Sequence, residues 1–196
     1  DRFFNKTYEF VEYNLKDYLT YCRPEWKFLE NKNSTLKKDT YYWLLEPLSG
    51  KENFKRSIPI FSSSISVFFN DKVIASSIYD PLRNDFYFAE EGKGAFLNDH
   101  RIRVSSRKFL ENSLISLQLN NSSFEIDNLF SKFQLPFKNF RIFNSSTVSV
   151  SWLCNGKLDC FIGIDMDQPF IKSSKLILRE SGGFFLETNL NETNFF

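Results

Sequence analysis

The spacing of apolar residues near the start of the chain predicts a helix over residues 1–19. Acidic residues and lysines separate these apolar positions, as expected for a helix with one buried side. The chain then reaches Arg23-Pro24, where proline ends the helix because it cannot continue the backbone hydrogen bonding. The apolar stripe consists of Phe3, Tyr8, Val11, Leu15 and Tyr18.

The following hundred residues have the pattern of an antiparallel meander. Runs rich in β-branched and aromatic residues are separated by short polar turns, such as Asn70-Asp71-Lys72. Gly92 and Gly94 mark another turn, in positions that need unusual dihedral angles or close backbone approach. Lys93 between them is interpreted as part of a structural turn, because no helix N-terminus follows to bind phosphate. The predicted strands cover residues 58–69, 73–79, 86–89 and 101–105.

The second half alternates between strand and helix patterns, which places the chain in the α/β (α+β) class. A helix is predicted over residues 122–133, with Ser122 or Ser123 as its N-cap and an apolar face. A second helix over residues 145–153 ends at Asn155-Gly156. The predicted strands of this half cover residues 114–119, 140–143 and 158–164.

Composition excludes several classes of function. Lys and Arg number 25 against 24 Asp and Glu, with a net charge of +1 and no block of like charge, so charge gives no argument for direct nucleic-acid or membrane binding. No apolar run approaches the ~20 residues that span a bilayer. With one histidine, His100, the chain has almost nothing from which to build a zinc site or a histidine-based triad. The three cysteines form no C-x-x-C pair, which suits a reducing cytoplasm.

The most informative stretch runs from Trp43 to Phe54, with the sequence WLLEPLSGKENF. Its apolar run, proline and Ser-Gly pair predict a buried strand that delivers a tight polar turn to a cleft. The stretch resembles the W-x-x-D-P-x-D-G-T-x-N-F signature of the inositol monophosphatase family, which are Mg²⁺-dependent, lithium-sensitive phosphomonoesterases. Its tryptophan, proline, glycine, asparagine and phenylalanine match. The two aspartates and the threonine are replaced by Glu46, Ser49 and Lys51.

Three further segments carry the same resemblance. Residues 79–105 are similar to the Y-x-P-x-x-D-E-x-F-x-A-x-x-G-x-G-A pattern of the bacterial extragenic-suppressor branch. Residues 141–147 correspond to R-x-x-G-S-A-A, with the arginine and the first serine retained. Residues 169–183 correspond to W-D-x-A-A-G-x-L-I-x-x-E-A-G-G, and the matching Glu180-Ser181-Gly182-Gly183 fixes the register. That register puts Phe170 at the metal-binding aspartate, and Asp165 and Asp167, just upstream, are expected to point elsewhere.

The resemblance implies the layered α-β-α-β-α sandwich of the sugar phosphatases. A meander half over residues 1–110 and a smaller α/β half over residues 111–196 are expected to form one compact unit. Relative to the family pattern, the chain is expected to be shortened at both ends. The resemblance also implies a homodimer, and the cysteine pattern described above predicts a cytoplasmic location.

The resemblance further implies a site whose metal ligands are mostly replaced. The two glutamates of the family's G-E-E strand become Asn31 and Lys32, and Glu46 is the surviving carboxylate. Mg²⁺ is the cofactor in the family, but none is expected here because too few hard oxygen ligands remain. The positions equivalent to the family's catalytic residues are Asn31, Glu46, Ser49, Gly50, Lys51 and Phe170.

Three functions stay open at this point. The first is an inactive family member, a pseudophosphatase that acts by binding. The second is a residual phosphomonoesterase acting on inositol phosphate or a similar sugar or nucleotide phosphate. The third is a metal-free phosphate-binding or transcription-associated scaffold. In its phosphate-binding form a phosphorylated small molecule is held by Ser49, Gly50 and Lys51 together with Lys32, and in its scaffold form the partner is a protein of the transcription complex.

Overall fold

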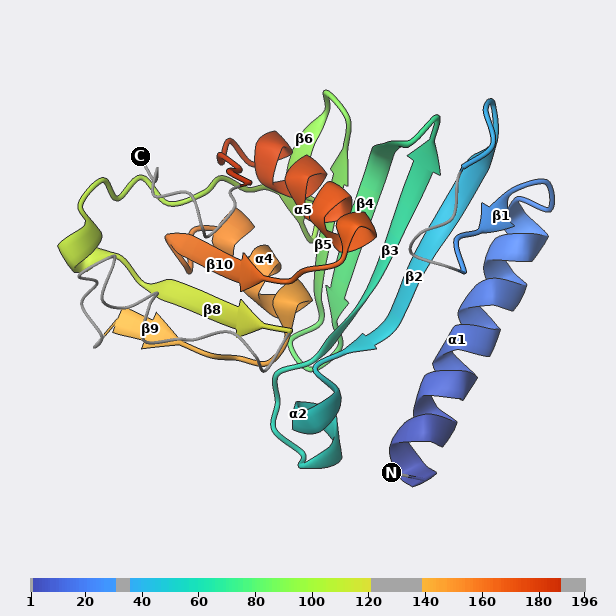
Figure 1. Cartoon of the computed structure of the whole chain (residues 1–196), viewed down its shortest axis with the longest axis horizontal. Helices are drawn as coiled ribbons and strands as arrows, with labels where there is room; N and C mark the ends of the chain where they lie inside the picture. Colours follow the sequence, from blue (N-terminus) through green and yellow to red (C-terminus); the bar gives the residue numbers. More distant parts are fainter. Residues whose placement is uncertain (1, 31–35, 121–138, 188–196) are drawn as a thin grey trace.

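A seven-stranded sheet dominates the computed structural model, which describes residues 2–30, 36–120 and 139–187 (Figure 1). The strands lie side by side in chain order and are antiparallel, except that β1 and β2 run parallel. The meander predicted for the first half is therefore confirmed. The strands are β1 Lys27–Phe28, β2 Tyr41–Ser49, β3 Ser62–Phe69, β4 Lys72–Asp80, β5 Asp85–Glu90, β6 Gly94–Leu97 and β7 His100–Arg101.

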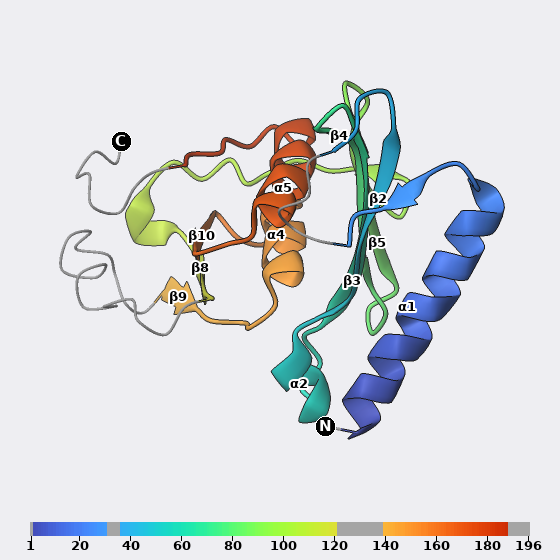
Figure 2. The same ribbon diagram turned by 45° about the vertical axis from the view of Figure 1, so that its right-hand side comes forward.

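Helices cover both faces of this sheet (Figure 2). Helix α1, Arg2–Cys22, packs on one face beside β2, and α4, Ser146–Cys154, and α5, Gln168–Glu180, pack on the other. A parallel three-stranded sheet, ordered β10-β8-β9, lies beyond α4 and α5. Its strands are β8 Ile115–Leu119, β9 Phe140–Arg141 and β10 Cys160–Ile164, and a 3₁₀ turn at Leu110–Asn112 precedes β8.

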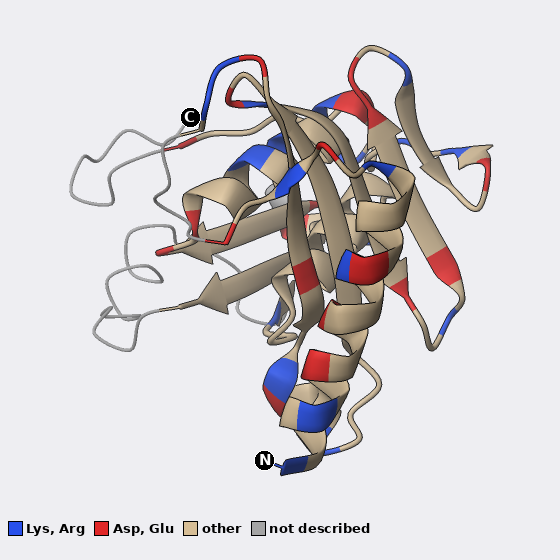
Figure 3. Ribbon diagram, turned by 90° about the vertical axis from the view of Figure 1, so that its right-hand side faces the viewer, with Lys and Arg blue, Asp and Glu red and all other residues tan. Residues whose placement is uncertain are grey.

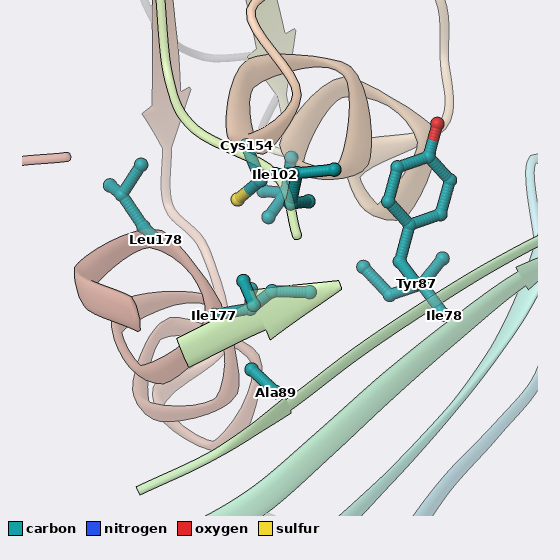
Figure 4. Packing of buried hydrophobic residues seen from close by; sticks show 9 residues of the cluster. Ile78, Tyr87, Ala89, Ile102, Cys154, Ile177 and Leu178 are labelled. Atoms are coloured by element: carbon teal, nitrogen blue, oxygen red, sulfur yellow. The ribbon is translucent and has the colours of Figure 1, made fainter. Parts of the chain in front are cut away.

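Four layers of the expected α-β-α-β-α sandwich are thus present in the described residues. The helix predicted over residues 122–133 lies outside them. The main core joins the two halves of the chain, because Ile78, Tyr87 and Ala89 of the large sheet pack against Cys154 of α4 and Ile177 of α5 (Figure 4). Asn155 donates a hydrogen bond to the Tyr87 hydroxyl at 3.1 Å, so the one polar atom of this fully buried ring has a partner.

The structure corrects several predicted element boundaries. Helix α1 extends to Cys22, three residues past the predicted end, and β3 begins at Ser62 rather than residue 58. The predicted last strand, residues 101–105, is strand only at its first residue, because it leaves the sheet after β7. Beyond β7 the Val104 amide donates to the Ser181 carbonyl at 3.1 Å, which ties this segment to the end of α5 instead.

Candidate functional site

A polar cavity of about 190 Å³ lies where the end of β2 approaches the start of α5. The arrowheads of β8 and β10 point toward the large sheet in this region (Figure 1), and the loop before α4 also contributes. Four elements far apart in the sequence therefore meet at one point. The lining residues are Glu46, Ser49, Gly50, Gln118, Asn120, Asn144, Ser146, Met166, Asp167 and Phe170.

The turn that closes β2 has a conformation that requires glycine. Gly50 has φ = 92° and is the N-cap of a short helix, α2, Lys51–Lys55, which the sequence patterns did not predict. A Cβ atom at this position would lie 2.7 Å from the carbonyl oxygen of Ile60, so any other residue would force the backbone apart. The glycine of the signature is thus explained by local geometry.

Asn53 joins this turn to the loop before α4. Its buried side-chain amide donates to the carbonyl oxygens of Ile60 at 2.8 Å and Phe143 at 2.6 Å. The second bond spans 90 residues of sequence and fixes the segment that carries Asn144 and Ser146 into the cavity. Phe54, the last residue of the signature, packs in the opposite direction, against Phe3 and Phe4 of α1.

Two carboxylates and several neutral polar groups line the cavity. Glu46 comes from β2, and Asp167 is the N-cap residue of α5. Asp167, which was expected to point elsewhere, is therefore among the residues that line the cavity. The Oε1 atom of Gln118, another residue of this lining, is buried and has no hydrogen-bond partner among the described residues.

The structure brings together four of the six predicted site positions. Glu46, Ser49, Gly50 and Phe170 all line the cavity, whereas Lys51 is not among its lining residues. The ammonium group of Lys51 lies 5.0 Å from the ring centroid of Phe4, on the α1 side of the turn. The remaining positions, Asn31 together with Lys32, lie outside the described residues.

Several cavity residues were not predicted as site residues. Gln118 and Asn120 stand at and just after the end of β8, where no sequence motif marks them. Asn144 and Ser146 lie in the segment similar to R-x-x-G-S-A-A, so their sequence did carry a signal. That segment was assigned only to a strand-helix junction, and its distance of 90 residues from Asn53 hid the contact.

The donor set of this cavity fits Mg²⁺ poorly. Mg²⁺ requires near-octahedral oxygen ligands and is usually held by carboxylates together with substrate phosphates. Phe170 presents a phenyl ring where the family pattern has a carboxylate, and this ring also packs against the main core. Within residues 2–30, 36–120 and 139–187, no three His, Cys, Asp or Glu side chains are placed to hold a metal ion.

Comparison with known proteins identifies the fold and its lineage. The model of the "Inositol monophosphatase family" matches residues 9–195. The chain belongs to the inositol monophosphatase family. Among curated relatives, it is 32% identical to the "Nus factor SuhB" of Buchnera aphidicola subsp. Acyrthosiphon pisum over 97% of its own length. It is 29% identical over 85% of its length to the "Inositol-1-monophosphatase" of Mesorhizobium japonicum.

Solved structures of relatives agree with this assignment. The extragenic suppressor protein suhB from Bartonella henselae superposes with a TM-score of 0.80 at 28% identity, covering 94% of this chain and 76% of that one. The Thermotoga maritima IMPase superposes with a TM-score of 0.72 at 26% identity, covering 85% of this chain and 64% of that one. The chain spans 73% of the Buchnera relative and 65% of the Mesorhizobium relative. Its described helices include none long and apolar enough to cross a membrane.

Proposed function

We propose that this chain is an inositol monophosphatase family protein that no longer catalyses metal-dependent phosphomonoester hydrolysis. The observation that carries the proposal is the composition of the cavity at the signature turn. Ser49 and Phe170 stand at positions where the family pattern has aspartates, and both line this cavity. The site keeps its place in the fold, while its oxygen ligands for a divalent ion are reduced mainly to Glu46 and Asp167.

The expected loss of activity is large because the family reaction depends on metal. Phosphoryl transfer is accelerated mainly by positioning and by neutralising developing charge, and a bound metal contributes several kcal/mol of that stabilisation. Each loss of about 1.4 kcal/mol reduces the rate tenfold. A cavity with two carboxylates also repels a phosphate ester electrostatically when no cation lies between them.

Asp167 favours one alternative, a residual phosphomonoesterase. Asp167 lines the same cavity as Glu46 and so gives it a second residue with a carboxylate. Such a site would bind Mg²⁺ through fewer charged ligands than the family pattern provides, so we expect weak binding and slow turnover under this alternative. The substrate would be inositol phosphate or a similar sugar or nucleotide phosphate.

A second alternative follows from the relatives named as Nus factors. A "Nus factor SuhB" is 32% identical to this chain, which supports a role as a protein-binding member of a transcription complex. This role requires no turnover and is compatible with an altered cavity. The related idea of a metal-free phosphate site receives less support, because Lys51 contacts Phe4 and does not line the cavity.

The deciding experiment is a calorimetric titration with Mg²⁺ alongside an assay of inositol 1-phosphate turnover. We expect no saturable Mg²⁺ binding at millimolar concentration and no turnover above the buffer rate. Turnover that is inhibited by lithium and abolished by Glu46→Ala would overturn the proposal. The matched control is Glu25→Ala, which removes an exposed carboxylate from the loop between α1 and β1 and should change neither measurement.

A further inference from the structure

A groove of about 700 Å³ is formed by α5, the β3–β4 and β5–β6 turns and the segment that follows α5. Among the described residues, it shares no lining residue with the cavity at the signature turn. Helix α5 lies on the face of the large sheet opposite α1 (Figure 2), and its basic residues are drawn in blue in Figure 3. The volume falls within the range of about 300–1,000 Å³ that is typical of ligand pockets.

The side of α5 that lines this groove carries a row of positive charges. Lys172, Lys175 and Arg179 are three and four residues apart, so they lie on the same side of the helix. No acidic residue occurs between residues 168 and 179. Val73 of β4 and Leu176 of α5 are buried and add an apolar part to the lining. The groove therefore combines an apolar surface with a basic wall.

The three cations are held only by exposed ion pairs with acidic residues from three different surface segments. The six side chains are 36% to 68% exposed. Exposed ion pairs contribute little to stability, so an acidic ligand can replace these partners at small cost. The pairs are Lys172–Asp71 at 2.6 Å, Lys175–Glu187 at 2.9 Å and Arg179–Glu91 at 3.5 Å.

The segment after α5 turns back along the helix and shows what the basic wall can bind. The ring centroid of Phe185 lies 4.4 Å from the ammonium nitrogen of Lys175, and the same ammonium donates to the carboxylate of Glu187. The residues between and before them, Leu186 and Phe184, are 73% and 94% exposed. This alternation is that of an extended segment with every second side chain on the helix.

We propose that this groove binds an extended acidic segment of a partner protein, and that Phe185 and Glu187 compete with it from within the chain. The three cations of α5 follow one another at about 4.5 and 6 Å along the helix axis. Alternate residues of an extended chain are about 6.6 Å apart. Three acidic residues at alternate positions can therefore each reach one cation, because the long basic side chains cover the small difference in spacing.

The other walls of the groove favour a peptide over a nucleic acid. Asp71 and Glu91 also line it, and their carboxylates repel a continuous phosphate backbone. A peptide with alternating acidic residues can place its uncharged positions beside them. The segment already bound to Lys175 is itself a stretch of peptide, and recognition of acidic motifs by clusters of basic side chains is a recurring mode of peptide binding.

The test uses fluorescence anisotropy of the full chain with a labelled peptide of sequence Gly-Glu-Ser-Glu-Ser-Glu-Gly. We expect saturable binding with a dissociation constant on the order of 100 μM. The isomer Gly-Ser-Glu-Glu-Glu-Ser-Gly should bind about three- to tenfold more weakly, because contiguous acidic residues cannot all face α5. No saturable binding, equal binding of the isomer, or displacement of the peptide by a short oligothymidylate of equal charge would overturn the proposal.

A charge reversal on α5 locates the peptide. Lys175→Glu should raise the dissociation constant about tenfold or more. Lys16→Glu is the matched control and should leave it unchanged within about twofold, because Lys16 lies on α1, on the other face of the sheet. Lys16 pairs with Glu12 at 2.9 Å, lies 5.7 Å from the ring centroid of Phe28 and is 36% exposed against 40% for Lys175. Circular dichroism establishes that each variant retains its helices, and equal effects of the two reversals would overturn the proposal.

Removal of the internal competitor tests the second part of the proposal. Glu187→Gln should lower the dissociation constant about two- to fivefold, because Lys175 then loses its resident carboxylate. Glu12→Gln removes the same charge and breaks a comparable ion pair with Lys16, and it should leave the dissociation constant unchanged. Binding that is unchanged or weakened by Glu187→Gln would overturn the proposal.

Discussion

The turn after β2 and the cavity beside it both contain residues of the family motifs, yet these residues have different physical roles. At the turn, Gly50 supplies a left-handed backbone and Asn53 satisfies two carbonyl oxygens. In the cavity, Glu46 stands where the family pattern has an aspartate, and Ser49 and Phe170 replace two further ligand positions. Gly50 and Asn53, which match the family pattern, therefore hold the backbone of the turn in place. The replaced residues are those whose loss affects mainly ion binding.

The end of α5 shows the same division. Glu180 of the second motif accepts backbone hydrogen bonds from Gly92 at 3.0 Å and Gly94 at 2.9 Å, which fastens α5 to the turn between β5 and β6. Phe170, in the first turn of the same helix, lines the cavity with a ring that cannot ligate a metal. Helix α5 therefore carries a carboxylate that stabilises the fold at its C-terminal end. In its first turn, beside the cavity, it carries an apolar residue instead.

The largest effect is expected from Asn53→Asp, which tests whether the turn residues stabilise the fold. The substitution replaces a donor by a carboxylate that faces two carbonyl oxygens in a buried site. We expect the free energy of unfolding to fall by about 3–4 kcal/mol, measured by urea denaturation. Asn84→Asp, at an exposed turn, is the control, and equal losses in the two variants would contradict a structural role for Asn53.

A somewhat smaller loss is expected from Glu180→Ala. The variant removes the acceptor of two backbone amides, and hydrogen bonds to a charged group contribute about 1.5–3 kcal/mol each when they are well formed. We expect a loss of about 2–3 kcal/mol in unfolding free energy. Glu180→Gln keeps one acceptor oxygen and should lie between the wild type and the alanine variant.

The same carboxylate makes a testable contribution to acid stability. Partial burial opposes ionisation of Glu180, but the Gly92 and Gly94 amides and the Arg179 charge outweigh it, so the pKa of Glu180 is lowered. The unfolded chain therefore binds this proton first as the pH falls. The stabilisation is present above the ordinary glutamate pKa of about 4.3 and is lost below it. Glu180→Gln should flatten the dependence of unfolding free energy on pH between about pH 5 and pH 3.

An intermediate effect is expected from Phe170→Asp, which tests whether the cavity residues determine Mg²⁺ binding. Phe170→Asp would place a third carboxylate in the cavity with Glu46 and Asp167, at a cost of about 1–3 kcal/mol from lost packing. Mg²⁺ at ten times its dissociation constant should then recover about 1.4 kcal/mol, or roughly 3–5 °C in melting temperature. The wild type and Phe170→Asn should show no such shift. A Mg²⁺ response of the wild type as large as that of the variant would contradict the proposed loss of metal binding.

The smallest effect is expected from Lys51→Ala. This change removes a surface cation-π contact with Phe4, which is worth about 0.5–1 kcal/mol. Inorganic phosphate should not raise the melting temperature of either the wild type or the variant, because this ammonium group does not line the cavity. A phosphate-dependent shift that disappears in Lys51→Ala would favour the metal-free phosphate site instead.

Local patterns were sufficient to predict much of the fold. The apolar stripe identified α1, and the turn residues between β-rich runs placed β3, β4 and β5 to within a few residues. Strand β6 was not predicted, because the sequence around Gly92 and Gly94 was interpreted as a turn. Helix α2 was missed because its five residues are too few to show a periodic pattern. The strand predicted to continue through residues 102–105 was wrong because the Val104 amide bonds to Ser181, the residue after the distant end of α5, rather than to a neighbouring strand.

The site was harder to predict because most of its members are brought together by tertiary contacts. The two family motifs supplied Glu46, Ser49, Gly50 and Phe170, and all four line the cavity. Gln118 and Asn120 have no motif of their own and reach the cavity only because β8 points at the large sheet. Asp167 was not expected at the cavity, because the position of a residue just before a helix depends on how the preceding loop turns.

The two edge strands of the large sheet are very short, and this affects how the protein can associate with other molecules. Both outer strands, β1 and β7, contain two residues each, and Lys27 and Arg101 place positive charges there. A strand from another molecule would find only two residues of main chain on each of these outer strands, and charged side chains there discourage edge-to-edge pairing. At β7 and β1 the sheet therefore offers little for the edge-to-edge pairing that a chain with many exposed aromatic rings would otherwise favour.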